Sequence, residues 1–423
     1  MSTSGPPSAR AYLRLVLLGA AIGIPAALVA ALFLALVHDL EHWLWDVLPG
    51  HVGHEEPPWY FVLGLPVVGA VIVLFARRTL PGDGGHTPLD GMGGGEPTPV
   101  EHAPSIALAA LGSLPFGAVL GPEAPVIALG SATGVAAARI ARLEGRSAAI
   151  VSSAGSFSAI SALFGGPLVA GMLLVEGSLG LGKAALPILL PGLVAAATGY
   201  LVFVGFGHWG GLHEAGLVVP NLPPYQGTHL RDLLVGLAVG LVTVIVVQGV
   251  RLIGVRVRVD AHARLGLAPV LFAGALAVGL LAELAGLLGA DSQDVLFSGQ
   301  TSVPSVIASD STKIVVILIV AKGIAYAISL ACGFRGGPIF PAIFLGVALA
   351  TLPVVWFGVS PTLAVAVGAA AGMAAQTKLL FAPLLFASLL IGPGDSAALP
   401  ATVFAAASAW LLATAIDQRH SAA

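Results

Sequence analysis

Two short Gly/Pro-rich segments could do chemistry together, because each places a glycine turn directly before the start of a helix. They read GPEAP at 121–125 and GGPIFP at 336–341. Proline suits the first turn of a helix, and glycine permits a tight entry into it. A helix start offers unpaired N–H groups and about half a positive charge, so two starts aimed at one point could bind a small anion. We expect such a site to be lined by Gly121, Pro122, Ala124, Gly337, Pro338, Ile339 and Phe340.

Glu123 lies in the first turn of the first of these helices. Its carboxylate could occupy the anion position and leave it on protonation or displacement, which would make Glu123 a gate and a proton carrier. The alternative is an ordinary acidic residue that stabilises a helix start. The second segment has Ile339 at the matching place, so we expect only one half of the chain to supply the gate.

The elements that position these segments have the composition of a membrane protein. Of the 423 residues, 57% are apolar and 9% are charged, whereas about a quarter of a soluble protein is charged. Apolar stretches near the roughly 20 residues that span a bilayer begin at Leu15, Trp59, Leu230 and Leu267. The sequence therefore predicts a multi-pass protein in a lipid bilayer, where an intramembrane carboxylate such as Glu123 is a functional candidate.

The charges predict orientation and exclude several classes of function. Arg10 and Arg14 precede the first apolar stretch, and Arg77 and Arg78 follow the second. By the positive-inside rule these ends, and with them the N-terminus, are predicted to be cytoplasmic in a cell membrane. The net charge of −3 without a basic patch indicates no nucleic-acid partner. With one cysteine, Cys332, and no metal-spaced cluster, phosphate loop or nucleophile–base pair, we expect no enzyme, cofactor or metal site.

The chain repeats itself at an offset of 216 residues. Residues 117–130 and 333–346 share seven identities in fourteen, where composition would give about one or two. The same offset aligns Pro167 with Pro383. Short apolar stretches between these breaks would end inside the membrane, and such interrupted pairs indicate a transport site.

We therefore predict an all-α, polytopic fold made of two inverted halves of broken and tilted helices. Its expected parts are a cytoplasmic N-terminus (1–14), a first transmembrane half (15–206), an outer loop (207–229) and a second transmembrane half (230–419), with no C-terminal regulatory domain.

These motifs resemble those of the CLC family of chloride channels and chloride/proton exchangers. GPEAP is similar to the family's G-(R/K)-E-G-P motif, with Glu123 at the gating glutamate. GFRGGPIFP at 333–341 is similar to G-x-x-G-G-x-F-x-P, and Lys322 resembles a lysine often found upstream of it. GGHTPLDG at 84–91 and FGGPLVAG at 164–171 resemble G-S-G-I-P-x-x-x-G and F-x-x-P-L-A-G. The resemblance implies a homodimer with one complete anion path in each subunit.

Several positions depart from the family pattern. Gly85 stands where the family has a serine that coordinates the central anion. Pro338 falls where the family has a backbone N–H that faces the anion, and proline has none. Thr402 is the match for the family's pore tyrosine, and the inner proton-transfer glutamate aligns with Gly177, one place after Glu176. The chain looks most like a short bacterial branch that lacks the central serine.

Four polar residues carry two interpretations each. Arg335 could bind an anion, or it could pair with a buried carboxylate such as Glu123, Glu176 or Glu283. His86 could donate an imidazole N–H to an anion or could be a solvated loop histidine. Glu176 could relay protons or lie at the cytoplasmic interface. Glu283 could take part in transport, but we expect a structural pairing with Lys322 or Arg335.

The expected function is transmembrane transport of a small inorganic anion, chloride by family default, as a CLC-type channel or a proton-coupled antiporter gated by Glu123. A fluoride exporter and a bicarbonate or other oxyanion transporter are alternatives with the same fold. An alternative from another class is a non-conducting membrane scaffold or sensor, because Gly85 and Pro338 have lost anion donors. Retention of Glu123 argues against the scaffold.

Overall fold

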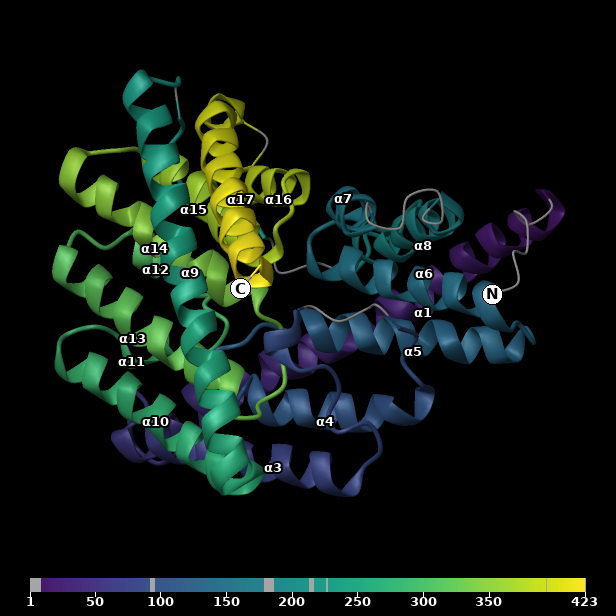
Figure 1. Cartoon of the computed structure of the whole chain (residues 1–423), viewed down its shortest axis with the longest axis horizontal. Helices are drawn as coiled ribbons and strands as arrows, with labels where there is room; N and C mark the ends of the chain where they lie inside the picture. The colour runs from purple at the N-terminus through teal and green to yellow at the C-terminus, as the bar shows by residue number, and fades with distance from the viewer. Residues whose placement is uncertain are drawn as a thin grey trace.

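The computed structural model of the chain is a helical bundle whose helices run in several directions and differ widely in length (Figure 1). It describes residues 9–91, 96–178, 186–212, 217–225, 227–392 and 394–422. Residues 1–8 of the predicted N-terminus, and 213–216 and 226 of the predicted outer loop, lie outside the described residues. Within the described ranges, eight helical segments are long and apolar enough to cross a membrane, which confirms the predicted polytopic all-α class.

Among the described residues, the first half of the repeat has eight α-helices, with three short π or 3-10 segments between them. They are α1 (Ala9–His42), a π segment (Trp43–Val47), α2 (Leu48–His51), α3 (Trp59–Thr79), 3-10 turns (Pro88–Asp90 and Val100–His102), α4 (Ala103–Ser113), α5 (Glu123–Ile140), α6 (Gly145–Leu163), α7 (Pro167–Gly177) and α8 (Leu186–Val204).

In the described part of the second half there are nine α-helices and one short 3-10 turn. They are α9 (Leu230–Leu265), α10 (Leu267–Leu287), α11 (Ser292–Val295), α12 (Val303–Ile307), α13 (Thr312–Ala331), α14 (Ile339–Phe357), α15 (Pro361–Thr377), α16 (Phe381–Ile391), a 3-10 turn (Ser396–Ala398) and α17 (Leu399–Ala422).

Helices α5 and α14 are equivalent in the repeat and run to opposite faces of the bundle. At the end of α5, Arg139 pairs with Glu101, which belongs to the segment that follows α3. That segment also meets the end of α9 through the Arg258–Asp90 pair, 3.2 Å. At the end of α14, in contrast, the Phe357 carbonyl accepts a hydrogen bond from Arg231 at the start of α9. The two halves are therefore inverted, as predicted.

We call the face with Arg77, Arg139 and Arg258 the Arg-rich face. Helix α1 begins there too, since Arg14 donates to the Ala141 carbonyl just beyond α5.

Glycines hold the two equivalent helices tightly against their neighbours. A Cβ at Gly130 of α5 would lie 2.6 Å from the Gly155 carbonyl oxygen of α6, and a Cβ at Gly346 of α14 would lie 2.1 Å from that of Gly368 in α15. Small residues that let helix backbones approach this closely are typical of membrane interfaces. Helix α14 is buried from Ile339 to Thr351. Its N-terminus is therefore a fixed point in the centre of the protein.

Candidate anion site

The two Gly/Pro segments meet at the centre of the molecule, where they form a single antiparallel bridge. The Gly121 N–H donates to the Gly337 carbonyl at 2.7 Å, and the Gly337 N–H donates back to the Gly121 carbonyl at 2.5 Å. Because both hydrogen bonds join one half to the other, the starts of α5 and α14 are held next to each other. The predicted convergence of the two segments is present in the structure.

Glu123 reaches across this bridge to the start of α14. Its Oε1 accepts the backbone N–H groups of Ile339 and Phe340, both at 2.8 Å, and the residue is fully buried. These amides are among the unpaired donors of the first helical turn, where the helix dipole favours negative charge. Pro338 directly precedes them and adds no N–H donor. The carboxylate thus occupies a place suited to a small anion.

Gly121 and Gly337 make room for this carboxylate. A Cβ at Gly121 would lie 2.1 Å from Glu123 Oε2, and a Cβ at Gly337 would lie 2.0 Å from the same atom. Both distances are far below van der Waals contact, so an alanine at either place would force the carboxylate to move. Oε2 itself has no hydrogen-bond partner among the described residues, and a buried polar atom left unpaired costs about 1–3 kcal/mol. The side chain is therefore held by one oxygen only.

An aromatic cluster fixes the other side of the same helix start. The Phe340 ring stacks on Phe164 with 5.6 Å between centroids and 9° between planes, and Phe386 of α16 packs edge-on against both rings. Phe164 directly precedes the turn into α7 and belongs to the first half. The donor residue Phe340 is therefore clamped by both halves of the repeat.

Tyr326 of α13 is a polar neighbour of this site that the sequence reasoning missed. Its side chain is fully buried, and its hydroxyl donates to the Pro338 carbonyl at 2.6 Å, with a longer contact of 3.4 Å to Gln376 Oε1 of α15. Pro338 directly precedes the two amides that hold Glu123. A tyrosine within an apolar helix carries no motif, and the signal that could have found it is its phenol, which needs a partner when buried.

Thr402, the predicted counterpart of a pore tyrosine, lies in the first turn of α17. It is fully buried, and its hydroxyl donates to the Ala398 carbonyl at 2.8 Å. This is a bond to the preceding turn, and in the described part of the chain Thr402 forms no hydrogen bond to Glu123, Tyr326 or the start of α14. The predicted role of Thr402 in the site therefore stays a prediction.

The loop after α3 carries Gly85 and His86 and approaches the Arg-rich side of the site. Gly85 has a φ of +88°, and a Cβ there would lie 2.9 Å from the Ile106 side chain of α4. The preceding Gly84 donates its N–H to Ser105 Oγ at 2.9 Å. His86 is exposed. The Gly84–Ser105 hydrogen bond thus holds the loop against α4. The loop has no side-chain hydroxyl at position 85.

Arg335 anchors the same loop, and its ionic partner is Asp83 rather than Glu123, Glu176 or Glu283. Nη2 lies 2.6 Å from Asp83 Oδ2, and Nε and Nη2 also donate to the Asp83 carbonyl at 3.0 and 2.8 Å. Arg77 donates to both carboxylate oxygens of Asp83 at 2.8 Å. Burial raises the pKa of Asp83, but hydrogen bonding to Arg77 and the charges of Arg77 and Arg335 outweigh it, leaving this pKa below its ordinary value.

Glu176 lies at the end of α7 and caps the start of α16. Its Oε1 accepts the N–H groups of Leu380 and Phe381 at 2.8 and 2.9 Å, and its Oε2 accepts that of Ala382 at 2.7 Å. A carboxylate at a helix start is stabilised by these donors and by the helix dipole. Both oxygens are satisfied, unlike those of Glu123.

Lys322 is fully buried without a carboxylate partner among the described residues. Its Nζ donates to the carbonyls of Asp294 and Leu296 at 2.9 and 2.6 Å, and it lies 4.5 Å from the centroid of the Phe344 ring. The expected pairing of Glu283 with Lys322 or Arg335 is wrong, since the described ion pairs join neither cation to it.

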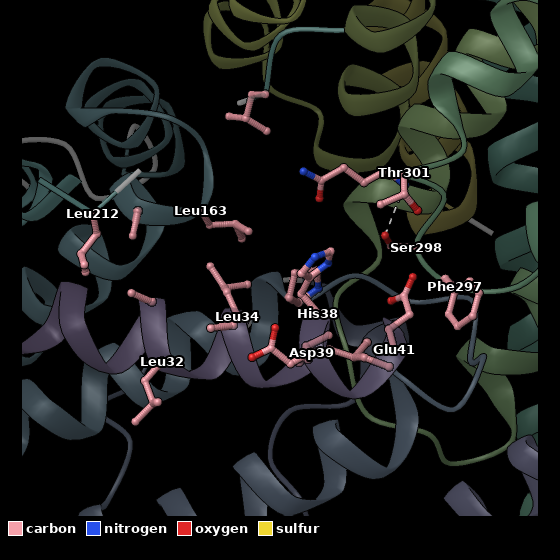
Figure 2. Close-up of a pocket in the computed structure, with 18 of the residues that line it drawn as sticks. Leu32, Leu34, His38, Asp39, Glu41, Leu163, Leu212, Phe297, Ser298 and Thr301 are labelled. Atoms are coloured by element: carbon pink, nitrogen blue, oxygen red, sulfur yellow. Dashed lines mark hydrogen bonds between the residues drawn. The ribbon is translucent and has the colours of Figure 1, made fainter. Parts of the chain in front are cut away.

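A cavity of about 720 Å³ opens toward the face opposite the Arg-rich face and reaches Pro122, next to Glu123. Figure 2 shows its polar rim, where His38, Asp39 and Glu41 at the end of α1 lie across from Ser298 and Thr301. Most of the remaining lining is apolar. Water and small ions can thus approach Glu123 from this side as far as the residue before it.

Comparisons with known proteins identify relatives of this chain. The family model described as "Voltage gated chloride channel" matches residues 87–413. The "Putative ion-transport protein YfeO" of Escherichia coli O1:K1 / APEC is 30% identical over 350 residues, which cover 81% of this chain and 79% of that protein.

Solved structures with the same fold include a CLC-type fluoride/proton antiporter, with a TM-score of 0.73 and 22% identity over 97% of this chain and 98% of that chain. A slow cyanobacterial Cl⁻/H⁺ antiporter has a TM-score of 0.71 and 16% identity over 99% of both chains. At these identities the similarity concerns the fold alone.

Proposed function

Because the chain belongs to the voltage-gated chloride channel (CLC) family, we propose that it moves a small inorganic anion, chloride in the first instance, past the start of α14, with Glu123 as the gate. CLC proteins are anion channels and transporters and not enzymes. The single observation that carries the proposal is the position of Glu123 Oε1 on the Ile339 and Phe340 amides, 2.8 Å from each, inside the protein.

The same two amides can hold either the carboxylate or an anion, but not both. An ionised carboxylate is expensive to move through a site without water, whereas a protonated one carries no charge and forms weaker hydrogen bonds to the amides. Protonation of Glu123 from the cavity on the open side would therefore free the amides. The anion would replace the carboxylate, and Glu123 would carry its proton, which favours proton coupling over a simple pore.

Tyr326 and Gln376 extend this path toward the Arg-rich face. The phenol O–H donates to the Pro338 carbonyl at 2.6 Å, and Gln376 near the end of α15 lies 3.4 Å from the same phenol. With Gly85 in place of a serine and Pro338 without an N–H, these two side chains supply hydrogen-bond donors for an anion that leaves the α14 amides. A side chain at position 85 would point at Ile106 of α4, so Gly85 does not itself widen the path, and the exposed His86 lines its mouth.

The proposal includes an assembly and an orientation. We propose a homodimer in the cell membrane with a complete path in each subunit, as the family implies, and with the Arg-rich face and the N-terminus in the cytoplasm, following the positive-inside rule. We propose that Glu176 acts as the cap of α16 and not as a proton relay, since both of its oxygens are held by backbone amides.

The test is flux through purified protein in liposomes, with efflux of chloride, fluoride, nitrate and bicarbonate measured together with proton movement. Wild type should show anion efflux coupled to proton uptake, and Glu123→Ala should retain anion efflux while losing proton movement. The matched control is Glu55→Ala, which removes an exposed carboxylate from the turn after α2 and should behave as wild type.

Each alternative has its own outcome in this assay. Absence of flux for every anion, relative to empty liposomes, would support a non-conducting scaffold. Selective efflux of fluoride or bicarbonate would replace chloride as the substrate but keep the gate. If Glu123→Ala leaves rate, pH dependence and coupling unchanged, Glu123 is not the gate.

A further inference from the structure

We propose that the guanidinium of Arg335 is a second anion-binding site, on the Arg-rich side of Glu123, and that the Asp83 carboxylate occupies it in this structure. The inference rests on the proposed anion path. Its ligand class is a monovalent inorganic anion that accepts hydrogen bonds, such as chloride, bromide or nitrate. Glu123 and Asp83 would then close two successive sites in the same way.

The charges around Asp83 are unbalanced in favour of an anion. Arg77 and Arg335 contribute two positive charges, and both pair with the single carboxylate of Asp83. The neighbouring Arg258 is already paired with Asp90 at 3.2 Å. Among the described residues, no other carboxylate lies within ion-pair distance of Arg335. The local charge of the Arg77, Arg335 and Asp83 group is therefore +1, and it favours a bound anion.

The two partners differ sharply in exposure. The Arg335 side chain is 4% exposed and that of Asp83 is 60% exposed. Asp83 can therefore swing into water at little cost, whereas a buried guanidinium left without a negative partner costs several kcal/mol. Arg335 will release Asp83 only when another anion takes its place. This is the behaviour of an exchangeable site rather than of a permanent structural ion pair.

The guanidinium has donors to offer. Nε donates to the Asp83 backbone carbonyl and Nη2 donates to the Asp83 carboxylate. Nη1, in contrast, has a single long contact of 3.4 Å to Thr87 Oγ1 among the described residues. Arginine presents its N–H groups as a planar fork that binds anions through two donors at once. A small anion between Nη1 and Nη2 could accept both donors and use the Thr87 hydroxyl as a third.

The second site is rigidly connected to the first. The Arg335 N–H donates to Ser113 Oγ at the end of α4, and a Cβ at Gly336 would lie 2.6 Å from the Leu120 side chain. Three residues lie between Arg335 and Ile339, so the Cα atoms of these two residues are within about 14 Å of each other. In both sites, hydrogen-bond donors of the second half are occupied by a carboxylate of the first half.

Bromide detected by its anomalous scattering in crystals of the full-length protein tests this site directly. In Asp83→Asn the anion competitor is gone, and bromide should bind at Arg335, adding one bromide per chain relative to wild type. Asp83→Gly provides a second variant, because glycine tolerates the φ of +48° at this position. The matched control is Asp90→Asn, which frees Arg258 on the same face and should add no bromide at Arg335.

The double variant Asp83→Asn/Arg335→Gln should lose the added bromide. Folded Asp83→Asn or Asp83→Gly protein without bromide at Arg335 would overturn the inference. Glu123→Ala, soaked in parallel, reports on the first site. If bromide appears at the Ile339 and Phe340 amides there but not at Arg335 in the Asp83 variants, the second site is wrong and the proposed function stands. If bromide is absent from those amides, the proposed function itself is wrong.

Discussion

The proposed exchange of Glu123 for an anion predicts that Glu123→Gln will bind anions more tightly than wild type does. Glutamine has nearly the same size and can still place an oxygen on the Ile339 and Phe340 amides, but it has no charge. It also puts an NH₂ group where Oε2 lies, beside Gly121 and Gly337, where the described residues offer no hydrogen-bond partner. The side chain should therefore compete less well for the two amides.

The size of the effect follows from the two hydrogen bonds at 2.8 Å. A hydrogen bond to a charged group contributes about 1.5–3 kcal/mol, and one between neutral groups about 0.5–1.5 kcal/mol. Loss of the charge therefore weakens the competitor by about 1–1.5 kcal/mol at each amide, or about 2–3 kcal/mol in all. At about 1.4 kcal/mol per tenfold change, anion affinity should rise by roughly 30- to 150-fold.

Isothermal titration of purified protein in detergent with chloride and nitrate measures this affinity near neutral pH. Glu123→Ala should bind at least as tightly as Glu123→Gln, and the exposed-site control Glu55→Gln should match wild type. Equal anion affinities in wild type, Glu123→Gln and Glu123→Ala would refute the reasoning, because the carboxylate would then not compete for the anion position.

Three other residues give predictions of their own. Tyr326→Phe in the Glu123→Ala background should lower anion affinity by about tenfold, because one donor worth about 1.5 kcal/mol is lost; an unchanged affinity by titration would remove Tyr326 from the path. Glu176→Ala should lower the free energy of unfolding by about 1–2 kcal/mol because the α16 cap is lost. The melting temperature should fall while the proton-to-anion transport ratio stays unchanged. Loss of proton transport in this variant would instead establish a proton relay. The pKa of Asp83 lies below its ordinary 3.8, so its ion pairs should stabilise the fold above that pH and be lost as the pH falls through the lowered pKa. The difference in melting temperature between wild type and Asp83→Asn should therefore shrink in acid. A difference that grows in acid would contradict the stabilising role of the Asp83 ion pairs.

The sequence predicted the parts of the site that depend on the repeat. The 216-residue offset aligned Gly121 with Gly337, and these residues are in fact hydrogen-bonded to each other. Helix starts at Glu123 and Ile339 followed from the local chemistry of glycine and proline. The pairing follows from comparing the two halves of the sequence and the helix starts follow from local residue chemistry, and both are confirmed.

The contacts between distant segments were not predictable in the same way. Arg335 meets Asp83 across 252 positions, and Glu176 meets Leu380 across 204. Sequence patterns show that these side chains are costly in a membrane and need partners, but which partner lies within reach depends on how the loops return through the bundle. Tyr326 illustrates the same limit, since its bond to Pro338 exists only because the chain turns back between α13 and α14.

The bridge between Gly121 and Gly337 bears on how access to the binding position can alternate between the two sides of a membrane. In transporters whose repeats rock against each other, the seam between the repeats opens and closes around the substrate. Here two buried backbone hydrogen bonds join the two repeats directly at the proposed binding position. Pulling the halves apart would break both hydrogen bonds and separate the helix starts that form the proposed anion position. We therefore expect alternation to come from the movement of individual side chains, with the two halves staying in contact.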